Sequence, residues 1–187
     1  MILPIYAYGS SVLRKESLEI DKDYPDLEQL ISDMFETMNK AEGVGLAAPQ
    51  IGNNIRLIVI DGEKMSDDFP EDDMGNFKLV LINPIIEEEF GDDFTFREAC
   101  LSLPRISDEI TRPSKIIITY FDKDWNLVES EFSGIKARII QHECDHLDGK
   151  LWIDRLSPLK RKLIQSKLNK ISKGQVFHNY PMNFSKK

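Results

Sequence analysis

The sequence has few cysteines, no long hydrophobic run and no basic N-terminal segment, and each absence narrows the class of protein. The chain of 187 residues contains only Cys100 and Cys144, too few for a disulfide framework. No apolar run approaches the length that spans a membrane, and the apolar Met1–Ile5 is far too short for an export signal. We therefore expect a cytoplasmic protein with reduced cysteines and no membrane partner.

Acidic residues are absent from the last part of the chain, although the protein as a whole is acidic. The net charge is −8, yet the segment from Leu156 onward holds seven lysines and one arginine and carries +8. Residues 1–155 therefore carry −16. Segregated charge of this kind favours an anionic partner for the basic segment. The alternative is an exposed helix face whose lysines keep the protein in solution, and the sequence leaves both interpretations open.

Repeats and long linkers are also absent, so the sequence predicts one domain over residues 1–187, ending in a basic helix and tail at 157–187. Apolar residues at helical spacing predict a helix opened by Pro25, another between Gly134 and Gly149, and a third from Ser157-Pro158 to Gly174. Runs of β-branched and aromatic residues predict strands at 55–60, 78–86, 115–121 and 127–132, and the acidic segment 61–76 predicts a solvated loop. This order predicts an α+β fold with antiparallel or mixed sheets packed around the second helix.

His142, Glu143 and His146 form the pattern H-E-x-x-H on that second helix. Histidines four positions apart lie one above the other on the same helix face. Ile135 and Ile139 lie within about 60° of them, so both imidazoles should point inward. Two imidazoles in an apolar layer need a partner for their lone pairs, and a divalent cation supplies one. Glu143, about 100° round the helix from His142, could then act on water as a general base.

The alternative is that both histidines lie in the core and are hydrogen-bonded to backbone carbonyls. A third ligand would favour the metal site over this alternative. A catalytic zinc-like site takes three protein ligands and leaves one position open for water. Trp152 stands where one metallopeptidase pattern places a histidine, and an indole cannot bind a metal. No glutamate follows the H-E-x-x-H pattern. Cys144 points about 200° away from the histidine face, and His178 lies in a short segment without a supporting pattern. Cys100, in a loop between two predicted strands, is the best-placed thiolate, although alone it would be taken as an inert buried thiol.

The glycine-rich stretch GVGLAAPQIG resembles a dinucleotide-binding turn at first sight. That fingerprint follows a strand and opens a helix. Here Gly43 and Gly45 follow a predicted helix, and Pro49 interrupts what comes after. The stretch instead predicts a loop whose small residues let a ligand or another backbone approach closely.

Three stretches, GVGLAAPQ (43–50), EACLS (98–102) and QHECDH (141–146), together resemble the signature motifs of peptide deformylases. The similarity extends from VLRK near the N-terminus to LSPLKRK in the third predicted helix, and so covers essentially the whole chain. It implies a metal-dependent hydrolase that removes the formyl group from the N-formylmethionine of newly synthesised polypeptides and releases formate.

The resemblance also implies the metal site. Its ligands would be Cys100, His142 and His146, and Glu143 would be the general base and acid. The implied metal is Fe(II), with Zn(II), Ni(II) or Co(II) as replacements. An ordinary metallopeptidase, or a metal that only holds the fold together, remains a competing function.

Roles for the first two motifs follow from the same resemblance. Gln50 and the backbone N–H of Leu101 would stabilise the oxyanion, and Val44 and Gly45 would line the cleft where the peptide pairs as an extra strand. Ala99, also at the substrate, stands where the family normally has glycine. If φ at this position is positive, alanine destabilises the fold by about 1 kcal/mol or more relative to glycine. If the backbone is extended, the methyl group only narrows the substrate cleft.

The implied substrate is the N-formylmethionyl end of nascent bacterial or organellar chains. Ribosomal RNA near the exit tunnel then becomes a candidate partner for the basic segment 157–187, and no DNA partner is expected. We further expect Asp145 to pair with Arg112 and Glu98 to accept an imidazole N–H, with placement of these residues on the surface as the alternative.

Overall fold

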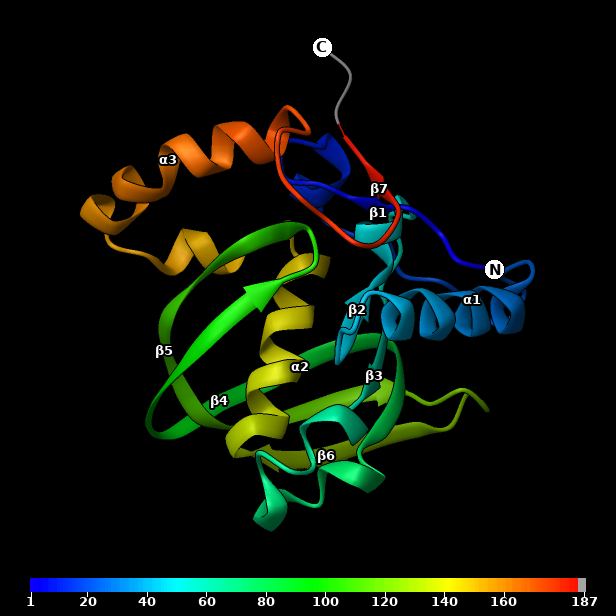
Figure 1. Ribbon diagram of the computed structural model, residues 1–187. Coiled ribbons are helices and arrows are strands. Elements are labelled where there is room, and N and C mark those ends of the chain that lie inside the picture. The colour runs from blue at the N-terminus through cyan, green and yellow to red at the C-terminus, as the bar shows by residue number, and fades with distance from the viewer. Residues whose placement is uncertain (185–187) are drawn as a thin grey trace.

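The computed structural model describes residues 1–184, which form three α-helices, two sheets and several 3-10 turns (Figure 1). The larger sheet is antiparallel, in the order β2-β3-β4-β5-β6. Its strands are β2 (Gly45–Ala47), β3 (Leu57–Asp61), β4 (Lys78–Cys100), β5 (Leu103–Phe121) and β6 (Leu127–Ser133). In the smaller sheet, β1 (Ile5–Tyr6) pairs in parallel with β7 (Met182–Asn183), so the two ends of the described chain lie side by side.

The helices are α1 (Leu27–Lys40), α2 (Gly134–Leu147) and α3 (Pro158–Ser172). Figure 1 shows α2 in the middle of the molecule, with the strands of the larger sheet wrapped around it. Its apolar side chains join strand residues such as Ile116 and Ile118 in one buried cluster. The predicted α+β fold, with sheets around the H-E-x-x-H helix and a helix toward each end, is confirmed.

Strands β4 and β5 are much longer than predicted. The expected strands 78–86 and 115–121 continue toward each other until only Leu101 and Ser102 separate them. The added part of β4 is rich in exposed acidic residues, which disfavour strands in isolation, but its backbone is paired along β5 with several register shifts. The prediction that Cys100 lies in a loop is therefore wrong, because it is the last residue of β4.

Smaller corrections concern other boundaries. Helix α1 begins at Leu27, two residues after Pro25, and the strand expected at 55–60 occupies Leu57–Asp61. The predicted glycine-rich loop contains β2 and a 3-10 turn at Ala48–Ile51.

The acidic segment 61–76 is not simply a solvated loop. It forms three short 3-10 turns, and Met74 is only 1% exposed within the cluster around α2. Partly buried Met65 and Phe69 pack against the same cluster. These three apolar side chains anchor an otherwise charged segment.

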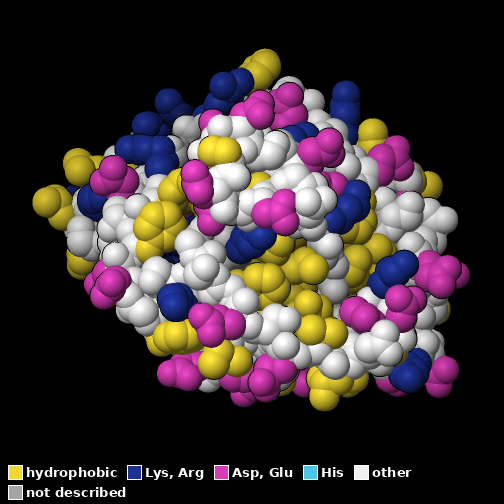
Figure 2. All heavy atoms as spheres, turned by 90° about the horizontal axis from the view of Figure 1, so that it is seen from below, with side chains coloured by type: hydrophobic (Ala, Val, Ile, Leu, Met, Phe, Trp, Pro, Cys, Tyr) yellow, Lys and Arg dark blue, Asp and Glu magenta, His cyan; other side chains and the backbone are white. Residues whose placement is uncertain are grey.

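Helix α3 has the predicted limits, and Ser157 caps it by accepting a hydrogen bond from the N–H of Lys160 at 3.3 Å. In Figure 2 lysine and arginine side chains gather at one edge, on the side where α3 lies, while acidic side chains are spread over much of the rest. The last residues of the predicted basic tail, 185–187, lie outside the described residues. None of the described helices has the length and apolarity needed to cross a membrane.

Candidate active site

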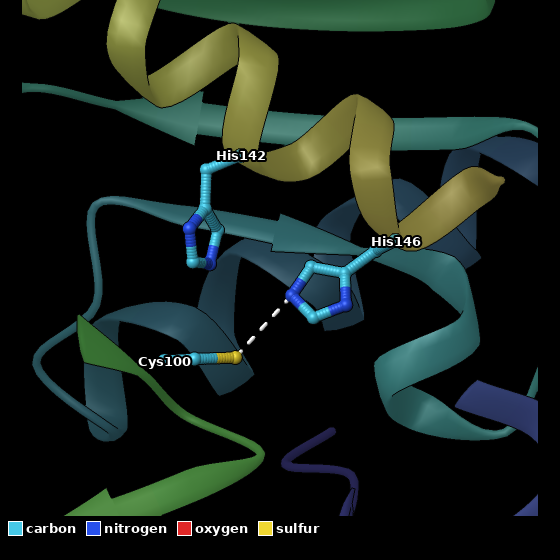
Figure 3. Close-up of side chains that lie close together, drawn as sticks. All are labelled: Cys100, His142 and His146. Atoms are coloured by element: carbon cyan, nitrogen blue, oxygen red, sulfur yellow. Dashed lines mark hydrogen bonds between the residues drawn. The ribbon is translucent and has the colours of Figure 1, made fainter. Parts of the chain in front are cut away.

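A thiol and two imidazoles meet between β4 and α2. Cys100 ends β4, and His142 and His146 lie one turn apart on α2, on the face that also carries buried Ile135 and Ile139. The Sγ atom of Cys100 lies 3.3 Å from Nε2 of His146, and one ligand atom from each of the three residues lies within 4.8 Å of the others (Figure 3). The structure thus brings together the three residues that the sequence singled out as ligands.

The two cysteines differ sharply in their surroundings. Burial alone would raise the pKa of the Cys100 thiol, but the charge on His146 and hydrogen bonds with both histidines lower this pKa to about 5. Burial raises the pKa of Cys144 well above its ordinary value. Cys144 packs in the hydrophobic cluster around α2, as expected from its position on the helix. The surroundings of Cys100 therefore favour the thiolate, which is the form that binds metals, and those of Cys144 favour the neutral thiol.

Glu98 supports His142 from behind. Its carboxylate is 3% exposed and accepts a hydrogen bond from Nδ1 of His142 at 2.8 Å. Arg112 donates to both Glu98 oxygens, at 2.7 and 2.9 Å, and to Asp145 at 2.7 Å. Burial would raise the pKa of Glu98, but the hydrogen bonds from His142 and Arg112 hold it well below the usual range. The predicted contacts of Glu98 and of Asp145 are confirmed. In the neutral imidazole, a proton on Nδ1 leaves Nε2 of His142 with a lone pair.

Two further arginines extend this network, the buried Arg138 and the exposed Arg155, and the sequence analysis missed both. Arg138 donates to Glu98 at 3.0 Å and to the carbonyl of Ile110 at 2.7 Å. Arg155 binds Asp145 through two hydrogen bonds of 2.8 and 3.0 Å. Arg138 precedes His142 by one helical turn on the same face, a spacing that could have indicated it. No comparable sequence signal marks Arg155.

Glu143 lies in the wall of the site, and one of its carboxyl oxygens makes no hydrogen bond with the described residues. The residue is 5% exposed, and its Oε2 has no hydrogen-bond partner among the described residues. Burial raises the pKa of Glu143 despite the nearby His142 and His146. A Cβ atom added to Gly45 would lie 2.5 Å from Oε1 of Glu143, so this position has no room for a side chain. The small residues of the glycine-rich stretch were expected to admit a ligand or another backbone, and at Gly45 the group that approaches is instead the Glu143 side chain.

Gln50 faces the same group of residues from the 3-10 turn after β2. Its Oε1 accepts a hydrogen bond from the N–H of Ala47 at 2.9 Å, which fixes the orientation of the amide. Its Nε2 then points toward Sγ of Cys100, at 3.5 Å, and Oγ of Ser102, at 3.3 Å. A buried amide donor is therefore directed at the site.

A cavity of about 680 Å³ opens onto these side chains. Val44 and Gly45 line it on one side and Ala99 and Leu101 on another, together with the exposed edges of Cys100, His142 and Glu143. The chain therefore places the residues expected at the substrate around one cavity.

Ala99 lies within β4 opposite Ser107, is exposed, and is not among the residues with positive φ. This excludes the strained conformation that the replacement of glycine raised as an alternative.

Besides Cys144, the sequence analysis rejected two further ligand candidates, Trp152 and His178. Trp152 is 1% exposed and packs in the hydrophobic cluster that also contains Cys100 and Leu168, but its indole N–H cannot bind a metal. His178 lines the cavity, but its Nδ1 lies 2.9 Å from the carbonyl oxygen of Tyr180, and it does not join the three-residue cluster.

With this geometry in place, comparison with known proteins identifies the family. The family model for polypeptide deformylase matches residues 2–162. The chain belongs to the peptide deformylase family. The peptide deformylase of Christiangramia forsetii is 47% identical over 189 residues, which cover 98% of this chain and 96% of that protein. The peptide deformylase of Cytophaga hutchinsonii is 45% identical over 184 residues, with 98% of each chain covered.

Solved peptide deformylases also share the fold. The crystal structure of the Legionella pneumophila enzyme has a TM-score of 0.79 and 38% identity, and the match covers 94% of this chain and 98% of that one. The Synechococcus elongatus enzyme, solved in complex with actinonin, has a TM-score of 0.77 and 36% identity, with 97% and 92% covered. This deformylase is a metal-dependent hydrolase that removes the N-formyl group from nascent polypeptides, as the sequence motifs predicted.

Proposed function

We propose that Cys100, His142 and His146 bind the divalent ion of this deformylase and that Glu143 is its general base and acid. The proposal is supported by three ligand atoms within 4.8 Å of one another and by the buried Oε2 of Glu143, which has no hydrogen-bond partner among the described residues. One thiolate and two imidazoles with a position left open match the ligand set of a catalytic ion. A site that only holds the fold together would take a fourth side chain.

The side chains supply proton transfer. When bound, a divalent ion here supplies Lewis acidity and lowers the pKa of water toward neutrality. Glu143 accepts a proton from the attacking water, whose oxygen forms a bond to the formyl carbon. The bond between that carbon and the nitrogen then breaks, Glu143 donates the proton to the departing amine, and formate is released. A raised pKa suits Glu143 to hold the proton between these steps.

Gln50 and Leu101 stabilise the negative charge that develops on the formyl oxygen. The Gln50 amide already points toward Cys100, and the Leu101 N–H belongs to the residue that follows this ligand. Donors fixed in place before the reaction need no reorganisation during it. Loss of one such donor typically costs about 10²–10³ in rate.

The substrate peptide binds along β2. This strand is at the edge of the larger sheet, so an extended peptide can pair with the backbone at its start, by Gly45, whereas the N–H of Ala47 already donates to Gln50. Val44 and Gly45, at its start, and Ala99, at the end of β4, then border the formylmethionyl residue. Actinonin, which binds the Synechococcus enzyme, is expected to compete for this cavity.

We propose Fe(II) as the metal in the cell, with Zn(II), Ni(II) or Co(II) as replacements. Two imidazoles and a thiolate accept several of these ions. An Fe(II)–thiolate site open to solvent is sensitive to oxygen, because the sulfur can be oxidised. Protein purified without oxygen should contain iron and lose activity in air, and zinc in freshly isolated anaerobic protein would contradict this assignment.

We propose that the basic face of α3 binds ribosomal RNA near the exit tunnel, which places the enzyme in the cytoplasm beside its nascent substrates. Among the described residues, the following lysines of this region have no ion pair: Lys162, Lys167, Lys170 and Lys173. Charge reversal of these four should weaken co-sedimentation with ribosomes, whereas reversal of exposed Lys22 and Lys123 should not. Binding that does not weaken with salt would count against this partner.

We also propose that residues 1–187 form one catalytic domain, which ends in the basic helix and tail at 157–187. The cluster that contains Cys100 combines residues as distant as Ala7 and Leu168, which supports a single folding unit.

The activity is tested by offering the metal-loaded protein formyl-Met-Ala and unformylated Met-Ala. Formate release from the first, with the second left intact, is expected. Cleavage of the Met–Ala bond would instead support a metallopeptidase. Glu143→Ala should retain the metal and lose turnover, while Cys100→Ser should compromise both.

A further inference from the structure

The chain beyond α3 forms part of the cavity wall. Residues 177–180 line the same cavity as Cys100 and Glu143. The next residues are fixed by the small sheet, because the N–H groups of Ile5 and Ala7 donate to the carbonyls of Pro181 and Asn183 at 2.9 Å. This segment lies beyond residues 2–162, which the deformylase family model matches. Part of the wall therefore comes from a portion of the chain outside the family pattern.

A hydroxyl group from this segment holds the turn that carries Leu101. The Oη of Tyr180 donates a hydrogen bond of 2.8 Å to the carbonyl oxygen of Leu101. The next carbonyl, that of Ser102, accepts a hydrogen bond of 2.8 Å from the N–H of Tyr8. Both carbonyls of the two-residue turn between β4 and β5 are thus bound from outside the hairpin.

The side chain of Leu101 is held by a second contact, with the glycine-rich stretch. A Cβ atom added to Gly43 would lie 2.8 Å from Cδ1 of Leu101, so the leucine packs directly on the glycine-rich stretch. With its carbonyl and its side chain both held, the residue has little freedom to rotate its N–H. Burial raises the pKa of Tyr180, so its hydroxyl keeps the proton that it donates.

A second contact connects the segment to β5. The guanidinium of Arg105, near the start of β5, lies 4.8 Å from the ring centre of Phe177. Both residues line the cavity. The segment is thus connected to the hairpin at Arg105 as well as at Leu101.

Resting on the proposed role of the Leu101 N–H, we propose that Tyr180 is a positioning residue for deformylation, whose hydroxyl orients Leu101 toward the developing oxyanion. A contact that improves the alignment of an oxyanion donor acts mainly in the transition state. Its loss should therefore lower kcat and leave KM nearly unchanged.

The test compares Tyr180→Phe with Tyr24→Phe in the metal-loaded enzyme. Tyr24 is a matched control, because its partly buried hydroxyl also makes a hydrogen bond, with Asn53, but it does not line the cavity. We expect Tyr180→Phe to lower kcat for formyl-Met-Ala about tenfold, with KM within about twofold of the unsubstituted enzyme. Bound metal and Tm should match those of Tyr24→Phe.

Equal kcat values for the two variants would overturn the inference. A lower kcat in Tyr180→Phe would also overturn it if the variant had lost metal or thermal stability to the same extent. Glu143→Ala separates this result from the proposed function. An active Glu143→Ala enzyme contradicts the catalytic roles themselves, whereas an inactive one beside a fully active Tyr180→Phe enzyme contradicts only the positioning role.

Discussion

Arg112 connects the hydrogen-bond partner of His142 to Asp145 on α2. It binds the Glu98 carboxylate that accepts the Nδ1 proton of His142, and it binds Asp145, the residue before His146. Because all of these groups are nearly buried, each charge depends on its partners. The orientation of His142 thus depends on a network of buried charges.

Glu98→Gln is expected to weaken metal binding. The glutamine amide has no negative charge to neutralise Arg112 and Arg138. Its oxygen can still accept a hydrogen bond from Nδ1 of His142, but the bond is weaker because the acceptor is no longer charged. Loss of such an outer partner typically lowers metal affinity about 10–100-fold, which chelator competition measures. Glu129→Gln is the control, because Glu129 is exposed on β6. Equal competition curves for the two variants would show that Glu98 does not support the ligand.

Gly45→Ala should displace the general base without removing the metal. The new Cβ atom would lie 2.5 to 2.9 Å from three atoms of the Glu143 side chain, which must move. Misplacement of a catalytic group by about 1 Å can cost about 10²-fold in rate. We expect kcat to fall by about tenfold or more while the metal content stays unchanged. Gly75→Ala is the control, because a Cβ there meets only one atom, at 4.0 Å; equal kcat values would contradict the placement of Glu143.

Asp154 should contribute to stability in a way that depends on pH. Its carboxylate binds Arg161 at 2.8 Å and the N–H of Leu151 at 2.9 Å, and it also pairs with Arg14. Burial raises the pKa of Asp154, but the hydrogen bonds with Arg14 and Leu151 lower it overall. The stabilisation is therefore present above the unfolded pKa, about 4, and is lost as the pH falls through the folded value.

Urea unfolding between about pH 3 and pH 7 measures this contribution. Asp154→Asn should be less stable than the unsubstituted protein at neutral pH, and the difference should shrink below about pH 4. Asp124→Asn, at an exposed position before β6, should leave the profile unchanged. A constant difference across the range would refute the linkage.

Ala99→Gly restores the residue that the deformylase motif normally has. Because Ala99 has an extended conformation within β4, glycine should lower the free energy of unfolding by about 0.5–1 kcal/mol. Removal of the methyl group from the cavity wall should lower KM for formyl-Met-Ala if that group narrows the cleft. Thermal unfolding and steady-state kinetics measure the two effects, and an increase in stability would mean that Ala99 is strained.

Sequence patterns located the part of the site that lies on a helix. The spacing of Ile135, Ile139, His142 and His146 placed both imidazoles on the buried face of α2, because helix geometry relates these residues directly. Cys100 emerged by elimination among few candidates, and the family resemblance supported it. The family and the activity were predicted from three motifs and are confirmed by relatives that cover almost the whole chain.

The rest depends on contacts between residues far apart in the sequence. The sequence predicted strands shorter than β4 and β5, because the acidic residues near their turn have low strand propensity. In the structure, pairing between the two strands outweighs this low propensity. Tyr180 meets Leu101 across 79 positions, and no local pattern indicates the contact. Met74 similarly joins the core from a segment that composition alone describes as solvated.

The central claim is that one sulfur and two imidazole nitrogens bind the metal and leave a position for solvent. X-ray absorption spectroscopy of the metal-loaded enzyme, at the edge of the bound metal, tests it most directly. We predict one sulfur neighbour at about 2.3 Å together with nitrogen and oxygen neighbours near about 2.0–2.1 Å, and loss of the sulfur signal in Cys100→Ser. A spectrum without sulfur, or one with two sulfur neighbours, would contradict the account.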